Sequence, residues 1–216
     1  MNSLINIKGV IFDMDGTLLD SMPVWNQVAA SYLRKKGYQP EPNLWEQLKF
    51  LSLTQGVAFI KKQYGLIETN EEIEKEINLI IEDSYFNEIP MKPGVKAYLQ
   101  LLRSHDIPMC VATATDKYLA EACLKRLNIQ HYFKTIVTCQ EVGCGKDTPA
   151  IFEKALDSLG TVKGETYVFE DALHAAITAK HAGFRVIGIY DASAEGDWEA
   201  LRKIADKSIF SMEELL

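Results

Sequence analysis

The sequence is poor in cysteine and shows no cysteine pattern that would hold a metal ion. Its four cysteines are Cys110, Cys123, Cys139 and Cys144. The first two lie in apolar and helical patterns, where cysteine usually behaves as a small hydrophobic residue. Cys139 and Cys144 are close in sequence, but no Cys-x-x-Cys or His-x-x-x-His pair accompanies them. We therefore expect reduced, structural thiols rather than a zinc site.

Long apolar runs and an excess of positive charge are missing as well. No apolar stretch approaches the length that a membrane span needs, and residues 1–8 contain no basic leader followed by a long apolar segment. The formal net charge is −7, which argues against nucleic acid or an anionic membrane surface as a partner. We expect a cytoplasmic protein, and nothing in the sequence requires more than a monomer.

Apolar residues are abundant enough for a folded core. Of the 216 residues, 47% are hydrophobic, which suffices for one or two domains. Strand-like runs occur at residues 9–12, 109–112, 135–138, 167–169, 185–189 and 208–210. From residue 91 onward they alternate with helical patterns, as is typical of βαβ units. The sequence therefore predicts an α/β fold with a mostly parallel sheet and helices on both faces.

Residues 18–89 contain no convincing strand and interrupt this rhythm. Apolar residues recur there at helical spacing, and Thr69 with Glu72 resembles a capping box at a helix start. We expect an inserted helical bundle at 18–89, within a core formed by residues 1–17 and 90–216. Because the insertion leaves from the carboxyl end of the first strand, where open α/β sheets bind ligands, we expect a lid over the site rather than a fixed decoration.

The first strand ends at two carboxylates, Asp13 and Asp15. Two acids this close repel each other unless a cation or different roles separate them. Mg²⁺ would serve, because it prefers oxygen ligands. Asp13 could then attack phosphorus as a nucleophile while Asp15 shuttles a proton. Gly16 and Thr17 would turn the backbone sharply and offer donors to a phosphate.

The second strand of the core ends in hydroxyls. Thr113, followed by Ala114, stands where a hydroxyl can donate to a phosphoryl oxygen. Thr115 is expected to cap the helix that starts near Lys117. A hydroxyl at a strand end is weak by itself, since Ser and Thr also cap helices.

Two later strand ends carry charged groups. Lys146 lies in a glycine-rich loop before a helix, where a lysine would normally be read as a solvated surface charge. Glu170 and Asp171 follow an apolar strand, and a buried acid pair needs a cation. Asp171 could complete a Mg²⁺ shell, with Glu170 holding a metal-bound water or orienting its neighbours.

In this order, the four strand ends resemble the four motifs of the haloacid dehalogenase-like superfamily of phosphotransferases. Asp13-Met14-Asp15-Gly16-Thr17 is similar to the first motif, Thr113 to the second, Lys146 to the lysine of the third and Glu170-Asp171 to the fourth. Two positions depart from the pattern. Asp147 replaces the first proline of Lys-Pro-x-Pro, and Ala172 replaces the serine of Glu-Asp-Ser.

The resemblance covers nearly the whole chain and includes the position of the helical insertion. It implies a Rossmann-like core with a helical cap, in the branch of the β-phosphoglucomutases and small-metabolite phosphatases. Asp13 would form an aspartyl-phosphate, and Asp15 would protonate the leaving group and then activate water. Thr113 and Lys146 would hold phosphoryl oxygens, and Mg²⁺ would be bound by the Asp13 carboxylate, the Asp15 main-chain carbonyl and Asp171.

We therefore expect a Mg²⁺-dependent phosphatase that acts on a small phosphomonoester such as a sugar phosphate. A β-phosphoglucomutase-type phosphotransferase is the alternative. Such mutases usually carry a histidine after an Asp-Thr/Ser pair and an arginine in a cap loop. Here Trp25 follows Asp20-Ser21, and residues 48–55 contain Lys49 but no arginine. A catalytically idle sensor of a phosphorylated metabolite is less favoured, because no catalytic residue is missing.

Overall fold

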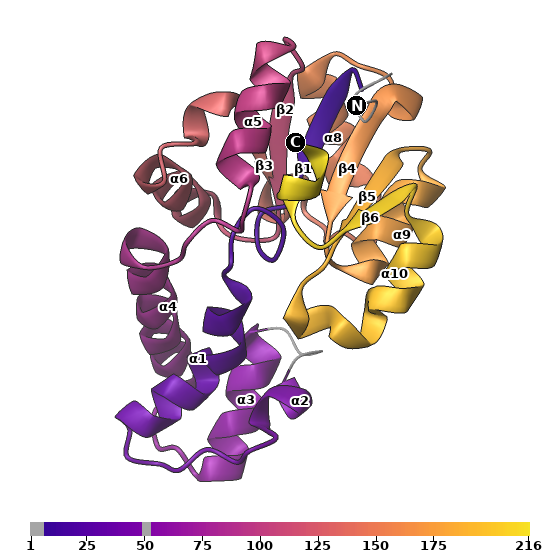
Figure 1. Cartoon of the computed structure of the whole chain (residues 1–216). Coiled ribbons are helices and arrows are strands. Elements are labelled where there is room, and N and C mark those ends of the chain that lie inside the picture. Colours follow the sequence, from indigo (N-terminus) through magenta and orange to yellow (C-terminus); the bar gives the residue numbers. More distant parts are fainter. Residues whose placement is uncertain (1–6, 49–52) are drawn as a thin grey trace. The chain divides into compact units, whose positions relative to one another are not determined.

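A computed structural model describes residues 7–48 and 53–216 of the chain (Figure 1). The chain forms two compact units, one made of Met1–Ser21 with Ile89–Leu216 and the other of Met22–Glu88. The larger unit contains the sheet, and the smaller unit is helical. Lys49, which bears on the mutase alternative, lies outside the described residues. No helix in the described part of the chain is long and apolar enough to cross a membrane.

The larger unit is built on a six-stranded parallel sheet with the order β3-β2-β1-β4-β5-β6. Its strands are β1 (Gly9–Phe12), β2 (Met109–Thr113), β3 (Phe133–Thr138), β4 (Thr166–Glu170), β5 (Arg185–Ile189) and β6 (Lys207–Ile209). The predicted α/β fold is confirmed. This strand order reverses direction between β1 and β4, and open parallel sheets bind their ligands at such a point, outside the carboxyl ends of the strands.

Helices cover both faces of the sheet (Figure 1). They are α5 (Val95–Ser104), α6 (Lys117–Arg126), α7 (Cys139–Val142), α8 (Ala150–Leu159), α9 (Leu173–His181) and α10 (Trp198–Ile204), with 3-10 turns at Gln130–Tyr132, Lys163–Glu165, Ala192–Asp197 and Met212–Leu215. On one face Phe12 packs edge-on against Tyr98 of α5, with ring centroids 6.5 Å apart. On the other face Ile11 packs in one buried cluster with α8 and α9. Both faces of β1 are thus buried, so its first polar side chains stand at its end.

The inserted unit consists of α1 (Met22–Lys35), α2 (Leu44–Leu48), α3 (Leu53–Tyr64) and α4 (Asn70–Asn87). The predicted capping box begins α4, because Thr69 Oγ1 accepts the N–H of Glu72 and Glu72 accepts the N–H of Thr69. Trp25 of α1 donates from Nε1 to the hydroxyl of Tyr85 in α4, at 3.0 Å. This hydrogen bond joins the first and last helices of the unit.

The connections to the inserted unit form a short two-stranded ribbon that belongs to the larger unit. Leu19 pairs with Met91 in an antiparallel bridge. Asp20 N donates to Pro90 O and Lys92 N donates to Leu18 O, each at 3.0 Å. This pairing explains why the structure divides at residues 22 and 88, whereas the expected insertion was 18–89.

Candidate active site

Two neighbouring strands place carboxylates together at the carboxyl edge of the sheet. Asp13 directly follows β1, whereas Glu170 ends β4 and Asp171 follows it. Phe12 pairs with Phe169, and Asp13 N donates to Phe169 O at 3.0 Å. The register therefore brings residues that are far apart in sequence to the same point of the edge. This is the point at which the strand order reverses.

The three carboxylates form a buried acidic cluster. One oxygen each from Asp13, Glu170 and Asp171 lies within 4.8 Å of the others. Burial raises the pKa of Asp13 to about 6, with Glu170 adding to the rise and Lys146 opposing it. Burial, together with the charges of Asp13 and Glu170, also raises the pKa of Asp171 well above its usual value. The cluster is therefore short of positive charge.

Lys146 supplies part of that charge. Its Nζ donates to Asp13 Oδ1 and to Glu170 Oε1, the latter at 2.6 Å. Burial alone would lower the pKa of this lysine, but the two carboxylates raise it above its ordinary value, so the side chain stays charged. The loop is shaped by Gly143, which ends α7 in the left-handed region at φ 74°. The lysine is thus held inward instead of being solvated.

The acidic cluster suits a divalent cation with oxygen ligands. Asp13 Oδ2 is buried and has no hydrogen-bond partner among the described residues. An unpaired buried carboxylate oxygen is costly, and a cation would relieve both this oxygen and the repulsion among the three acids. Asp171 keeps its carboxylate oriented by accepting the hydroxyl of Thr17 at 3.0 Å. The residues present therefore fit Mg²⁺.

Asp15 lies apart from the cluster and is held by two hydroxyls. Ser21 Oγ donates to Asp15 Oδ1 at 2.7 Å, and Thr115 Oγ1 donates to Asp15 Oδ2 at 2.6 Å. The expected helix cap at Thr115 is wrong. The N-cap of α6 is Asp116, which makes no side-chain cap hydrogen bond. The Thr115 hydroxyl is instead used on Asp15.

Gly16 and Thr17 form the turn beneath the cluster. Gly16 has φ 84°, and its N–H donates to Leu19 O at 2.9 Å. A Cβ at this position would lie 2.3 Å from Asp171 Oδ2. In this structure the Gly16 N–H and the Thr17 hydroxyl are both bonded within the protein, so they shape the turn instead of presenting free donors.

The end of β2 offers a different set of groups. Thr113 is fully buried, and its Oγ1 accepts the N–H of Thr115 at 3.0 Å. A hydroxyl that accepts in this way still has its own proton to donate. Ala114 is exposed beside it. The strand end thus combines a fixed hydroxyl with accessible main chain.

Comparison with known proteins bears on this arrangement. A model of the haloacid dehalogenase-like hydrolase family matches residues 10–189. The chain belongs to this family. The matched residues run from β1 to β5, so they include every strand end described above.

Several similar proteins are of nearly the same length as this hydrolase. "Phosphorylated carbohydrates phosphatase" of Thermotoga maritima is 26% identical over 97% of both chains. "Hexitol phosphatase A" of Escherichia coli is 28% identical and covers 96% of this chain and 93% of its own. A crystal structure from Thermotoga maritima, described as a candidate β-phosphoglucomutase, superposes with a TM-score of 0.80 at 27% identity and 97% coverage of both chains.

The main chain compensates for one departure from the family motifs. Ala172, in place of the motif serine, has no hydroxyl, but its main-chain N–H donates to Glu170 Oε2 at 3.2 Å. Glu170 therefore keeps a partner on each oxygen, since Lys146 occupies the other. The carboxylate stays oriented without the serine.

Sequence reasoning missed the contacts of Ser21, Thr115 and Lys92. Lys92 Nζ donates to Gly16 O, Tyr190 O and Asp191 Oδ2. The hydroxyls could have been noticed from their closeness to the first and second motifs. Lys92 matched no motif, and nothing local in the sequence distinguishes it from a surface lysine.

Proposed function

We propose that this haloacid dehalogenase-like hydrolase is a Mg²⁺-dependent phosphatase of small phosphorylated metabolites. The observation that carries the proposal is the setting of Asp13. It is a buried carboxylate with Lys146 on one oxygen and an unpaired second oxygen. A second acid, Asp15, is held two residues away by two hydroxyls. One acid is thus set up as a nucleophile and the other for proton transfer.

In the first step a carboxylate oxygen of Asp13 attacks the phosphorus atom of the substrate. A bond forms between that oxygen and phosphorus, and the bond between phosphorus and the leaving-group oxygen breaks. Asp15 gives a proton to the departing oxygen, which leaves as an alcohol. Thr113 and Lys146 donate to the phosphoryl oxygens, because the Thr113 hydroxyl proton and the third Lys146 proton remain for that purpose.

In the second step water attacks the phosphorus atom of the aspartyl-phosphate. Asp15, now ionised, takes a proton from that water. The bond between Asp13 and phosphorus breaks, inorganic phosphate forms and the Asp13 carboxylate is restored. Ser21 and Thr115 keep the Asp15 carboxylate in a defined orientation for both proton transfers.

Mg²⁺ would be held by the Asp13 and Asp171 carboxylates and the main-chain carbonyl of Asp15, with Glu170 orienting the surroundings. When bound, it supplies positive charge that offsets the negative charge of the phosphoryl group and the carboxylates. Thr17 and Gly16 keep Asp171 in place for this role, the first by its hydrogen bond and the second by having no side chain.

Sugar phosphates and polyol phosphates are the proposed substrate class. Support comes from relatives named as phosphatases of phosphorylated carbohydrates and hexitols. We propose that the inserted helical unit acts as the cap that selects the leaving group. A mutase is the second candidate, favoured by the candidate β-phosphoglucomutase structure. Against it stands Trp25, whose Nε1 is bonded to Tyr85 at the position where those mutases usually carry a histidine.

The test is phosphate release from a panel of sugar, polyol, nucleotide and glycolate phosphates, with Mg²⁺ and with EDTA. We expect metal-dependent release by the wild type, and Asp13→Asn should lower kcat by at least ~10⁴-fold because the nucleophile is lost. The matched control is Asp157→Asn, an exposed aspartate of α8 that has no side-chain partner among the described residues. Its kcat should stay within about twofold of the wild-type value.

Two outcomes would overturn the phosphatase proposal. Isomerised sugar phosphate without net phosphate release, in the presence of a bisphosphate activator, would establish the mutase. Binding of a phosphorylated metabolite without any turnover would establish a sensor.

A further inference from the structure

Lys92 is a partly buried lysine that belongs to none of the family motifs. It lies where the chain returns to the larger unit, and its side chain is only 13% exposed. Its Nζ donates to Gly16 O at 2.6 Å, to Tyr190 O at 2.7 Å and to Asp191 Oδ2 at 2.9 Å. An ammonium group has three protons, so these bonds use all of them. Lys92 therefore has no donor left for a substrate phosphate.

The acceptors of Lys92 belong to two loops at the active edge of the sheet. Gly16 is the centre of the turn that connects Asp15 with Thr17. Tyr190 and Asp191 follow β5, two strands away from β1 in the sheet order. Lys92 thus ties the turn after β1 to the loop after β5, across the end of β4.

The main chain of Lys92 and the carboxylate that its ammonium group meets are both held by further hydrogen bonds. Its N–H donates to Leu18 O at 3.0 Å, within the ribbon formed by residues 18–20 and 90–92. Asp191 is anchored as well, because its Oδ1 accepts the N–H of Ser193 at 2.9 Å and the Ser193 hydroxyl at 2.6 Å. The ion pair between Lys92 and Asp191 therefore joins two residues that are held in place, and not two mobile surface side chains.

Gly16 is the member of this network that most needs support. Glycine has the greatest backbone freedom of any residue, and Gly16 stands at φ 84°. The Gly16 carbonyl belongs to the same peptide plane as the N–H of Thr17. A hydrogen bond from Lys92 to this carbonyl fixes the tilt of the plane, and with it the directions of Asp15 on one side and of Thr17 on the other.

Lys92 also compensates a negative charge beside the acidic cluster. Asp191 is 7% exposed, and its charge adds to the rise in the pKa of Asp171. Hydrogen bonds from Ser193 and Lys92 outweigh burial and lower the pKa of Asp191, so this acid stays ionised. Without Lys92, the ionised carboxylate of Asp191 would lie near the proposed metal ligands with no positively charged partner among the described residues.

We propose that Lys92 is a positioning residue for phosphoryl transfer, which holds the Asp15-Gly16-Thr17 turn in its reactive geometry through the Gly16 carbonyl. The inference rests on the proposed phosphatase function. Small displacements of a reacting group lower the rate much more than they weaken ground-state binding. Lys92 should therefore contribute to the transition state and not to the binding of substrate.

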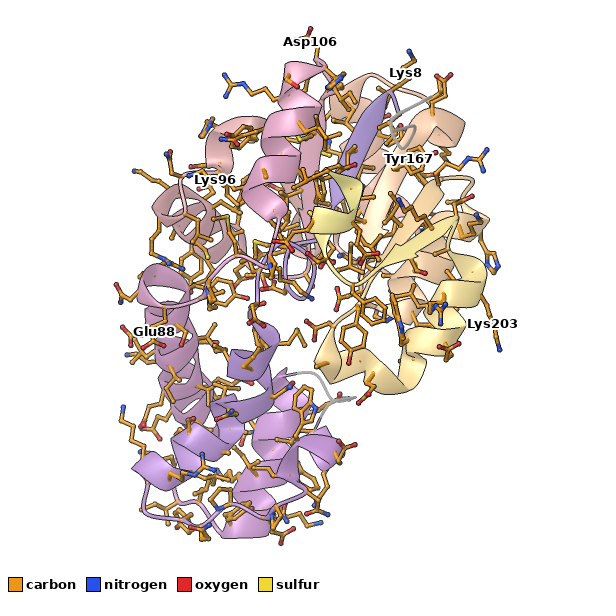
Figure 2. All side chains as sticks on the ribbon, in the orientation of Figure 1. Lys8, Glu88, Lys96, Asp106, Tyr167 and Lys203 are labelled. Atoms are coloured by element: carbon orange, nitrogen blue, oxygen red, sulfur yellow. The ribbon has the colours of Figure 1, made fainter. Side chains whose placement is uncertain are left out.

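The test compares Lys92→Met with Lys96→Met. Lys96 lies four residues further along, on α5, where it is exposed and has no side-chain partner among the described residues (Figure 2). Binding of orthovanadate, which mimics the phosphoryl group in transfer, is measured by calorimetry with Mg²⁺ present. Lys92→Met should weaken vanadate binding by at least ~10-fold and inorganic phosphate binding by less than ~3-fold. Lys96→Met should match the wild type in both.

Steady-state kinetics supply the second readout. On the best substrate of the panel, Lys92→Met should lower kcat by about 10- to 100-fold and leave KM within about threefold of the wild-type value. Equal losses of vanadate and phosphate binding, or a rise in KM with unchanged kcat, would overturn the positioning role. So would wild-type vanadate affinity in Lys92→Met.

A second variant keeps the test decisive if Lys92→Met does not fold. Lys92→Gln retains an amide that donates two hydrogen bonds, and it should weaken vanadate binding by at least about threefold while phosphate binding is retained. Unchanged vanadate binding in Lys92→Gln would overturn the proposal. If the wild type and Lys96→Met release no phosphate and bind no vanadate, the phosphatase proposal falls and this one falls with it. Tight vanadate binding by all variants overturns the Lys92 proposal alone.

Discussion

The active site leaves no room for a side chain at Gly16. An added methyl group would lie 2.3 Å from Asp171 Oδ2, and the backbone there is left-handed at φ 84°. Both facts require glycine, but for different reasons. The first depends on a neighbour 155 positions later in the sequence, and the second on the local turn alone. Substitutions can separate the two effects, because Gly37 is also in the left-handed region of the backbone but has no heavy atom of the described residues near the position of an added Cβ.

We predict that Gly16→Ala lowers kcat by at least ~100-fold, since it displaces the Asp171 carboxylate. Gly37→Ala is the matched control, with φ 86° and no heavy atom within 4 Å of its added Cβ. Gly37→Ala should lose about 1 kcal/mol of unfolding free energy through backbone strain, and Gly16→Ala should lose more, because it also displaces the Asp171 carboxylate. Only Gly16→Ala should lose activity. Similar kcat values for the two variants, measured with urea denaturation curves in parallel, would contradict this account.

At the scale of elements, local pattern located the strands but misjudged some of their ends. The last strand was expected at 208–210, and the structure has Lys207–Ile209. Ile209 pairs with Ile189, whereas Phe210 leaves the sheet and packs on Tyr190 and Trp198 with centroids 5.1 and 5.3 Å away. An aromatic residue fits a strand by propensity alone. Here Phe210 packs against neighbouring aromatic rings instead of continuing the strand.

Asp206 fastens α9 and β5 to each other just before β6. Its carboxylate accepts from Lys180 at 2.6 Å, from Arg185 at 2.9 Å and from the N–H of Val186 at 2.8 Å. Burial alone would raise the pKa of Asp206, but these hydrogen bonds lower it overall. A lowered pKa means that the folded state favours the charged form. Asp206 therefore stabilises the fold above the pKa of the unfolded chain, and this contribution is lost as the pH falls through the folded value.

We predict that Asp206→Asn lowers the unfolding free energy by about 1 kcal/mol at pH 7. The difference from the wild type should shrink as the pH falls below about 4, where the unfolded chain binds the proton first, and it should vanish once the pH is also below the lowered pKa of the folded state. Asp157→Asn serves as the control and should change stability little at either pH. Urea denaturation at several pH values measures the effect. A difference that persists undiminished at about pH 2.5 would exclude the charge of Asp206 as its cause.

The whole larger unit is assembled around a concentration of negative charge at one edge of its sheet. Asp13, Glu170 and Asp171 are buried within 4.8 Å of one another, and Lys146 is shared by two of them. Folding must bring these acids together whether or not a cation is present. A cation that binds only this arrangement would therefore stabilise the folded protein as well as promote the reaction.

We predict that Mg²⁺ raises the thermal unfolding temperature. At about one hundred times its dissociation constant it should add roughly 2.7 kcal/mol, which is about 5–10 °C for a chain of this size. Asp171→Asn should lose most of this shift and unfold at a similar temperature with Mg²⁺ or EDTA. Differential scanning fluorimetry measures both proteins. An equal shift in the variant would place the stabilising cation elsewhere.

The sequence by itself determined the parallel α/β fold and the residue types at each strand end. It could do so because a strand buried on both faces must be apolar, and its polar residues then mark where it ends. Asp13, Glu170 and Asp171 were identifiable on that ground, and Lys146 from its resemblance to a family motif. The structure brings the four together.

Only the tertiary structure decided which partner each side chain meets. Thr115 reaches Asp15 across 100 positions of sequence, and Lys92 reaches Gly16 across 76. Such contacts depend on the strand order β3-β2-β1-β4-β5-β6 and on the return path of the chain from the inserted unit. Local periodicity carries no information about either, because the same helices and strands are compatible with other orders. A hydroxyl or an ammonium group acquires its role only when the sheet has placed its acceptor.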